Sequence, residues 1–110
     1  MLQGDYQNAI TEYTKAIQLD PQLRNAYLGR AYAFSQLDEH QKSIDDDSMA
    51  IELDPSHAEA YYNRGISYGT LGEYQKAIAD FNMAIELDPK DAWAHYSRGN
   101  AYADLGEYQK

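Results

Sequence analysis

Small and aromatic residues recur along this chain at the spacing of α-helices that bury one face. Tyr61, Gly65 and Tyr68 stand at positions i, i+4 and i+7 among polar residues, which places them on one side of a helix. The next stretch repeats small and aromatic residues at helical spacing with Ala77, Phe81 and Ala84. These two faces are expected to pack together, because the small residues let two backbones approach while the aromatic rings interlock around them.

The same pattern returns every 34 residues, which indicates an array of repeats. In each copy, the helix with the Tyr61-type face is called the first-type helix, and the helix with the Phe81-type face is called the second-type helix. The positions that coincide after a shift of 34 residues are Pro21, Pro55 and Pro89; Ala16, Ala50 and Ala84; Arg30, Arg64 and Arg98; and Leu37, Leu71 and Leu105.

Proline marks the ends of the second-type helices. Pro21 follows Leu19 and Asp20 and is expected to end a helix there, because proline disfavours helical geometry in the residue before it and has no N–H to donate. The same Leu-Asp-Pro sequence recurs at Pro55 and Pro89. With these breaks the pattern predicts six helices, over residues 5–18, 24–37, 40–53, 58–71, 74–87 and 92–105.

Other residues are expected to shape the helix ends. Ser56 precedes Glu59 by three residues, as in a capping box, and Asp91 can cap the last helix. The glycines expected to supply a left-handed turn between a first-type and a second-type helix are Gly4, Gly72 and Gly106.

A 34-residue period with two helical halves and a closing proline resembles the tetratricopeptide repeat (TPR) family. In the central copy, residues 58–91, all seven pattern positions carry the residue type of the family: Tyr61, Gly65, Tyr68, Ala77, Phe81, Ala84 and Pro89. The resemblance covers the whole chain. It implies an all-α fold, a right-handed TPR solenoid of antiparallel helix pairs.

The phase of the repeat predicts a single array over residues 1–110 that starts on a second-type helix and ends on a first-type helix. Its expected parts are a half repeat, two whole repeats and another half repeat: 1–23, 24–57, 58–91 and 92–110. Because stacked repeats contact only their neighbours, the core is expected to be a strip rather than a ball.

Charge and hydropathy narrow the choice of partners. The chain has 9 Lys plus Arg against 18 Asp plus Glu, a net charge of -9, and a surface of that sign repels phosphate backbones and anionic lipid headgroups. We therefore expect no nucleic acid and no membrane as a partner. No apolar run approaches the length of a membrane span and no signal peptide is recognisable, so a cytoplasmic location is expected.

No group of residues stands out as a catalytic site or a cofactor site. An enzyme needs a nucleophile, a base and an orienting group, or a ligand cluster, brought together in a pocket. The chain has no Cys, and His40, His57 and His95 occupy scaffold or solvent positions, where a metal or catalytic role is the weaker interpretation. We expect neither an enzyme nor a bound cofactor.

Two sets of charged residues call for an explanation inside the scaffold. The arginines Arg30, Arg64 and Arg98 recur in phase with the acidic residues Glu12, Asp46 and Asp80. We interpret them as structural ion pairs rather than ligand contacts, because the planar guanidinium suits a carboxylate. Pairing within one repeat and pairing with the preceding repeat both remain open, although Arg98 has only Asp80 available.

Asp47 stands where the other second-type helices carry Tyr13 and Phe81. A buried carboxylate without partners is costly, so this position needs an explanation. One interpretation is a cation site or a pairing switch. The favoured one is a weak repeat, in which Asp47 is paired or leans to solvent.

In TPR arrays the first-type helices line the concave side, so the resemblance implies a groove formed by three helices of this chain. The implied peptide-binding residues are Leu28, Tyr32, Tyr62, Asn63, Ile66, Trp93, Tyr96 and Asn100, with Asn25, Gly29, Glu59 and Ser97 at the remaining positions. Tyr and Trp offer rigid apolar area, and Asn can hold a peptide backbone. For Tyr62 and Tyr96, packing against neighbouring helices is the alternative.

The resemblance also brings one ligand class into question. Chaperone-binding TPR domains hold a terminal carboxylate with Lys and Asn on the first inner helix, Asn on the second, and Lys and Arg on the third. The corresponding residues here are Leu28, Tyr32, Asn63, Trp93 and Ser97. Only Asn63 matches, and without the cations we do not expect binding of chaperone tails.

We expect a non-catalytic protein-protein interaction scaffold that binds an extended peptide or a partner helix in the groove. The net charge of -9 favours a neutral or basic peptide. The alternative is a structural spacer or self-assembling module that stacks head-to-tail with other copies into a superhelix. The faces expected to meet carry Ala9, Tyr13 and Ala16 on the opening helix, and His95, Gly99 and Tyr102 on the closing helix.

Overall fold

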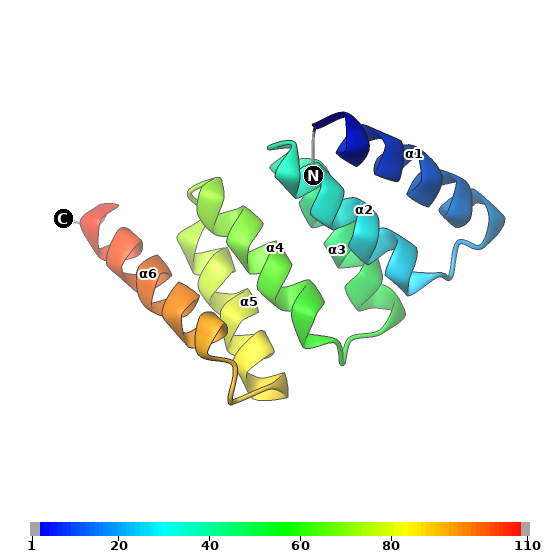
Figure 1. The fold of residues 1–110 in the computed structure, drawn as a ribbon. Coiled ribbons are helices and arrows are strands. Elements are labelled where there is room, and N and C mark those ends of the chain that lie inside the picture. Colours follow the sequence, from blue (N-terminus) through cyan, green and yellow to red (C-terminus); the bar gives the residue numbers. More distant parts are fainter. Residues whose placement is uncertain (1–2, 109–110) are drawn as a thin grey trace. The chain divides into compact units, whose positions relative to one another are not determined.

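A computed structural model describes residues 3–108, and within that range it contains six α-helices and no strand (Figure 1). The helices are α1 (Gln3–Leu19), α2 (Arg24–Gln36), α3 (His40–Leu53), α4 (Ala58–Thr70), α5 (Tyr74–Leu87) and α6 (Ala92–Tyr108). Each expected segment is helical, so the prediction of an all-α fold is confirmed. The first-type helices are α2, α4 and α6, and the second-type helices are α1, α3 and α5.

The helices form two compact units, Met1–Pro55 and Ser56–Lys110. In the first unit α2 packs against both α1 and α3, and consecutive helices run in opposite directions (Figure 1). In the second unit α5 packs against both α4 and α6 in the same antiparallel manner, and α4 also touches α6. The central helix is therefore α2 in the first unit and α5 in the second, and each packs against the other two helices of its unit.

The prolines and Asp91 act as predicted. Helices α1, α3 and α5 end at Leu19, Leu53 and Leu87, in each case two residues before the proline. At the start of α6, the Oδ1 atom of Asp91 accepts a hydrogen bond of 3.0 Å from the backbone N–H of Trp93. This bond satisfies one of the free donors of the first helical turn.

The predicted left-handed turns at Gly4 and Gly106 are wrong, because these residues lie inside α1 and α6. Among the described residues, positive φ angles occur at Gly72, with 81°, and at Asp38, with 60°. Both stand where a second-type helix folds back on the helix before it.

The start of α4 also differs from the prediction. His57 occupies the cap position without a side-chain cap hydrogen bond, and α4 begins at Ala58. A capping box with Ser56 as the cap requires the helix to begin one residue earlier, so that prediction is wrong. The carboxylate of Glu59 instead lies near the His57 ring, with 3.5 Å between Oε2 and Nε2.

The core of the second unit depends on the contact between Gly65 of α4 and Phe81 of α5. A Cβ atom built on Gly65 would lie 2.7 Å from Cε1 of Phe81, so only glycine leaves room for the ring here. Phe81 is 2% exposed, and its small neighbours Ala77 and Ala84 are also buried. The predicted packing of the Tyr61-type face against the Phe81-type face is confirmed.

In the first unit the equivalent positions carry Ala31 and Asp47. Asp47 is 0% exposed, so the interpretation in which it leans to solvent is wrong. Ser43, one turn earlier on α3, is 1% exposed, and it replaces the buried Ala77 of the second unit. Relative to the second unit, α2 therefore carries an additional methyl group at Ala31, and α3 lacks the aromatic ring of Phe81.

Two arginines form bidentate ion pairs within their own repeats. Arg30 donates from Nε and Nη2 to the Asp46 carboxylate at 2.7 and 2.8 Å. Arg64 donates to Asp80 in the same way at 2.8 and 2.7 Å. In both cases the carboxylate lies 16 residues later, which decides the question that the sequence left open. The hydrogen bonds with Asp46 raise the pKa of Arg30, because they favour its charged form.

Arg98 of α6 has a different partner. Its Nη1 atom donates a hydrogen bond of 2.9 Å to Oδ1 of Asn82, 16 residues earlier. Arg30 makes the same backward contact with Thr14, whose Oγ1 accepts from Nη1 at 3.2 Å. The predicted pairing of Arg98 with Asp80 is therefore wrong, since the Asp80 carboxylate binds Arg64.

Replacing Asp47 measures the cost of burying a carboxylate between α2 and α3. The double variant Asp47→Phe/Ala31→Gly recreates the Gly65–Phe81 pair. We expect it to raise the free energy of unfolding by roughly 1–3 kcal/mol, because a desolvated carboxylate gives way to apolar area. Asp47→Phe alone should gain less, since the Ala31 methyl group crowds the ring. In chemical denaturation, a double variant less stable than wild type would contradict this account.

Candidate functional site

On α2, the candidate residue that faces solvent is Tyr32, which is 53% exposed. Its ring meets Tyr6 of α1 edge-on, with the ring centroids 6.4 Å apart. Loss of solvation raises the pKa of the Tyr6 phenol, and the neighbouring Tyr32 adds to the shift. Leu28, one turn earlier on α2, is partly buried. In the first unit, the aromatic surface at the predicted groove is therefore formed by Tyr32 together with Tyr6 of α1.

Gly29 does not offer the open surface that the groove prediction gave it. A Cβ atom built there would lie 2.6 Å from Cε1 of Tyr13, so the tyrosine ring of α1 covers this glycine. Because Gly29 has no side chain, the Tyr13 ring can lie against the α2 backbone, and α1 packs closely on α2 at this point. Tyr13 is consequently half-buried rather than fully presented to a second copy.

On α4, Tyr62 is mainly a packing residue. Its ring lies against Phe81, with 5.9 Å between the ring centroids, and its hydroxyl shares a hydrogen bond of 3.3 Å with Oγ of Ser97 on α6. The alternative of packing against neighbouring helices therefore describes Tyr62. Asn63 beside it is partly buried, and Ile66 one turn further on is 41% exposed.

On α6, Trp93 and Tyr96 form an exposed aromatic pair. The two rings are perpendicular, with an interplanar angle of 89° and centroids 5.8 Å apart. Trp93 is 67% exposed and Tyr96 is 62% exposed, so each keeps apolar area free for a ligand. The Asp91 cap binds the backbone N–H of Trp93, and the two rings contact each other in an edge-to-face arrangement.

A cleft of about 240 Å³ lies between α4 and α6, and we call it the α4/α6 cleft. Residues from three helices line it, among them Ile66 and Thr70 of α4, Tyr74 and Phe81 of α5, and Asn100 and Asp104 of α6. The structure thus brings together three of the predicted groove residues, Ile66, Ser97 and Asn100. Ser97 also shares a hydrogen bond with the Tyr62 hydroxyl.

The groove prediction missed Thr70 and Asp104. The positions taken from the family end at the ninth residue of each first-type helix, and these two side chains lie one turn beyond it. Thr70 follows Ile66 by four residues and Asp104 follows Asn100 by four, so helical periodicity alone places them on the same faces. Among the described cleft residues, Asp104 is the only charged one.

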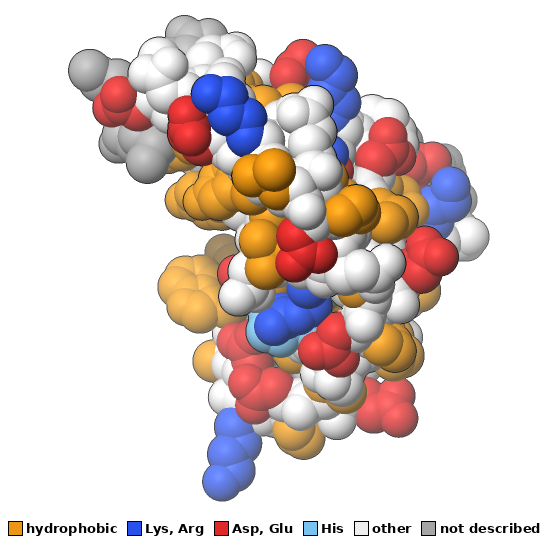
Figure 2. Space-filling model, turned by 90° about the vertical axis from the view of Figure 1, so that its right-hand side faces the viewer, with side chains coloured by type: hydrophobic (Ala, Val, Ile, Leu, Met, Phe, Trp, Pro, Cys, Tyr) orange, Lys and Arg blue, Asp and Glu red, His pale blue; other side chains and the backbone are white. Residues whose placement is uncertain are grey.

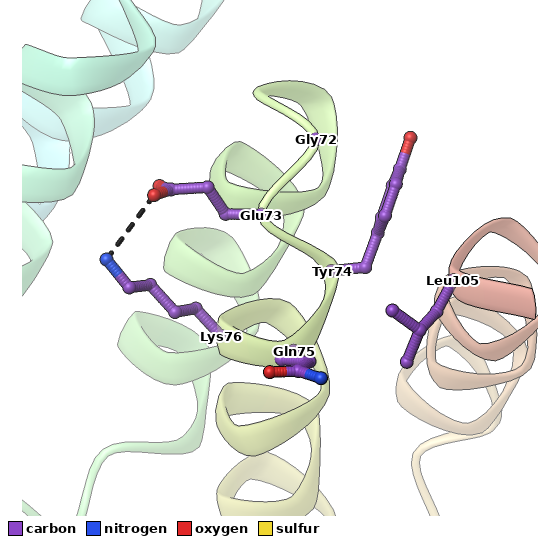
Figure 3. Close-up of a pocket in the computed structure, with 6 residues that line it drawn as sticks. All are labelled: Gly72, Glu73, Tyr74, Gln75, Lys76 and Leu105. Carbon is purple, nitrogen blue, oxygen red and sulfur yellow. Dashed lines mark hydrogen bonds and ion pairs between the residues drawn. The ribbon is translucent and has the colours of Figure 1, made fainter. Parts of the chain in front are cut away.

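A second cleft, of about 380 Å³, lies at the start of α5 and is closed on one side by Leu105 of α6. Figure 3 shows the Tyr74 side chain standing between the two helices, with Leu105 facing it from α6. Glu73 and Lys76 point the other way and form an ion pair of 3.3 Å (Figure 3). Tyr74 lines both clefts and so forms a wall between them.

The chain is acidic overall, with 18 Asp plus Glu against 9 Lys plus Arg. Figure 2 shows acidic side chains spread over one face of the molecule, with basic side chains at fewer places and hydrophobic side chains exposed between them. The net charge of -9 gives this distribution a field that favours cationic ligands.

The histidines are dispersed. His40 lies 3.7 Å from Asp38, and His95 is exposed, with Nε2 3.2 Å from the carbonyl oxygen of Pro89. Across residues 3–108, no three His, Asp or Glu side chains come together in a way that could hold a metal ion. In the same range, no helix is long and apolar enough to cross a membrane.

The two end helices differ in how much of the predicted contact faces they leave open. On α1, the three residues are each partly buried: Ala9, Tyr13 and Ala16. On α6, the three residues are exposed: His95, Gly99 and Tyr102. A Cβ atom built on Gly99 would meet nothing within 4 Å, so α6 is open to solvent at this position.

The 34-residue period, the antiparallel helix pairs and the close contact of glycine with an aromatic ring define an α-helical repeat protein. Comparison with protein-family models identifies the kind of repeat. A model described as TPR repeat matches residues 1–38. Two models described as tetratricopeptide repeat match residues 58–91 and 81–110. The chain belongs to the tetratricopeptide repeat family, and its fold is an all-α TPR solenoid.

Solved TPR structures are similar over most of the chain. The first TPR of Spaghetti (RPAP3), bound to the HSP90 peptide SRMEEVD, is 29% identical, with a TM-score of 0.91 over 94% of this chain and 82% of that one. The Arabidopsis OM64 TPR domain is 30% identical, with a TM-score of 0.88 over 91% and 83%. MamA is 35% identical, with a TM-score of 0.89 over 92% and 55%. Comparison with curated proteins gave no match.

Truncating two of the aromatic residues should separate packing from ligand surface. Tyr62→Ala should lower the free energy of unfolding by about 2–4 kcal/mol, because it removes a ring packed on Phe81 and leaves a cavity. Trp93→Ala should change it by no more than about 1 kcal/mol, because that ring faces solvent. Chemical denaturation measures both variants. Equal losses would contradict the assignment of Tyr62 to the core and Trp93 to the surface.

Proposed function

We propose that this chain is a non-catalytic protein-interaction scaffold whose first-type helices bind an extended peptide or a helix of a partner. In this proposal residues 1–110 act as one array in the cytoplasm, without nucleic acid or membrane partners. The observation that carries it is the exposed Trp93–Tyr96 pair, which lies one turn from the α4/α6 cleft on the same helix.

This surface has the properties of a binding site rather than of a solvated helix face. Exposed Trp and Tyr side chains supply large rigid contact area at little cost in side-chain entropy, and they are enriched among residues that dominate binding energy. The polar groups of Asn100 and Asp104 follow the aromatic pair along α6. Such a combination can fix the orientation of a bound segment.

The ligand class differs from that of one similar structure. The Spaghetti domain is bound to SRMEEVD, a peptide with a net negative charge. In the present chain, the positions that would hold a terminal carboxylate carry Leu28, Tyr32, Trp93 and Ser97, and none of these is a cation. We infer that the ligand is a neutral or basic peptide.

Peptide binding provides the test. On an array of heptapeptides, the protein should bind neutral and basic sequences and should not bind SRMEEVD that carries its free terminal carboxylate. Affinity for the basic peptides should fall when salt rises from about 0.1 to about 1 M, because the Debye length shortens from about 10 to about 3 Å. Fluorescence anisotropy of the best peptides measures this dependence.

The matched variants for this experiment are Trp93→Ala/Tyr96→Ala, which removes the aromatic surface, and Glu86→Gln, which changes an exposed charge on α5. The first should abolish binding while circular dichroism shows an intact helical fold, and the second should bind like wild type. A preference of the wild type for acidic peptides, or retention of binding by the aromatic double variant, would refute the proposal.

A second candidate function is self-assembly as a head-to-tail spacer. It is favoured by the open face around Gly99. Gly99 occupies the same repeat position as Gly65, against which the Phe81 ring packs. Residues 4–10, GDYQNAI, also closely match residues 72–78, GEYQKAI, at the start of α5. In this proposal α1 of one copy covers α6 of the next, with Tyr13 against Gly99.

Sedimentation velocity over a wide concentration range tests self-assembly. Wild type should associate as concentration rises, and Gly99→Glu should remain monomeric, because it places a charged side chain on the receiving face. Since that position is open in the single chain, the variant should fold normally. Gly99→Ala is the control with a minimal side chain. A wild type that stays monomeric at millimolar concentration would exclude this candidate.

A further inference from the structure

We propose that the α4/α6 cleft binds a Lys or Arg side chain of the peptide ligand, and that Asp104 determines this specificity. The inference rests on the proposed peptide-binding function and names the chemistry of one ligand residue. It concerns the second unit alone, where α4, α5 and α6 pack together.

The cleft combines apolar walls with a single charge. Ile66 of α4 and Phe81 of α5 contribute apolar area, and Asp104 of α6 contributes a carboxylate. Lys and Arg side chains match this arrangement, because their methylene stems cover apolar surface while the charged group stays near water and an acceptor. A purely apolar side chain would fill the walls but leave the carboxylate unused.

The charge of Asp104 is available to a ligand. The side chain is exposed, and in residues 3–108 no Lys or Arg lies within ion-pair distance of it. Two other carboxylates of this unit are already paired, Asp80 with Arg64 and Glu73 with Lys76. A basic ligand group therefore does not have to displace an internal partner.

Two neutral oxygen atoms supplement the carboxylate. The Thr70 hydroxyl donates its proton to the backbone carbonyl of Ile66 at 2.9 Å, which leaves its lone pairs as acceptors. Asn100 lines the same cleft one turn before Asp104, and its amide oxygen is another acceptor. Ammonium and guanidinium groups carry several N–H donors and can use these acceptors together, whereas a carboxylate ligand meets repulsion from Asp104.

The position of the basic residue within the peptide follows from helix geometry. Trp93 and Asp104 are separated by eleven residues of α6, a rise of roughly 16 Å. An extended peptide covers that length in about five residues. The ligand is thus expected to carry an apolar or aromatic residue for the Trp93–Tyr96 pair and a Lys or Arg about five positions away.

A positional array of blocked heptapeptides tests this assignment with the full chain. One position is replaced at a time by Arg, Lys, norleucine or Glu, and the proteins compared are wild type, Asp104→Asn, Asp104→Lys and Glu86→Gln. Wild type should bind the Arg or Lys peptide about fivefold more tightly than the norleucine peptide at one position, the size of one partly exposed ion pair.

Asp104→Asn should lose that preference, and Asp104→Lys should select Glu at the same position. Glu86→Gln carries the same charge change as Asp104→Asn outside the cleft and should keep the wild-type preference. Peptide binding without any position-specific preference for a basic residue would overturn this inference and leave the proposed function standing. Retention of the preference by Asp104→Asn would likewise overturn the inference alone. Failure of the folded wild type to bind any peptide would overturn both.

Discussion

The contact between an aromatic ring on a second-type helix and a glycine on a first-type helix is the constraint on which the second unit depends. Because Gly65 has no side chain, Phe81 can lie against the α4 backbone and α5 can approach closely. The same ring supports Tyr62, whose hydroxyl binds Ser97 and so links α4 to α6. The α4/α6 cleft lies where these contacts meet, and the buried Phe81 ring forms part of its wall.

The first unit keeps the same architecture with different pairs of side chains. Ala31 and Asp47 replace glycine and phenylalanine, so a larger residue on one helix accompanies a smaller one on the other. Tyr13 packs against Gly29, again a ring against a glycine, although Gly29 lies on another part of the first-type helix. The array thus keeps its helix pairs although the Ala31–Asp47 pair has less side-chain volume than the Gly65–Phe81 pair.

The fold was predictable from the sequence because helical periodicity, proline breaks and a 34-residue repeat all indicate the same elements. The arginine partners could not be assigned in this way, since a shift of 34 residues cannot distinguish carboxylates of neighbouring copies. Asp38 was missed as a left-handed residue because glycine is the usual signal for that conformation. Asp104 was missed for a simpler reason, since the family positions ended before it while the helical face continued.

Arg30 joins all three helices of the first unit, since its guanidinium binds Thr14 of α1 and Asp46 of α3 from its own position on α2. A side chain shared in this way couples the opening of neighbouring helices, because the release of either partner weakens the hold on the other. In the second unit the ion pair joins α4 to α5, whereas Arg98 of α6 donates to the uncharged amide oxygen of Asn82 on α5. Within the second unit we therefore expect α6, which presents the exposed aromatic pair, to open locally before α4 and α5, and its amide protons to exchange first.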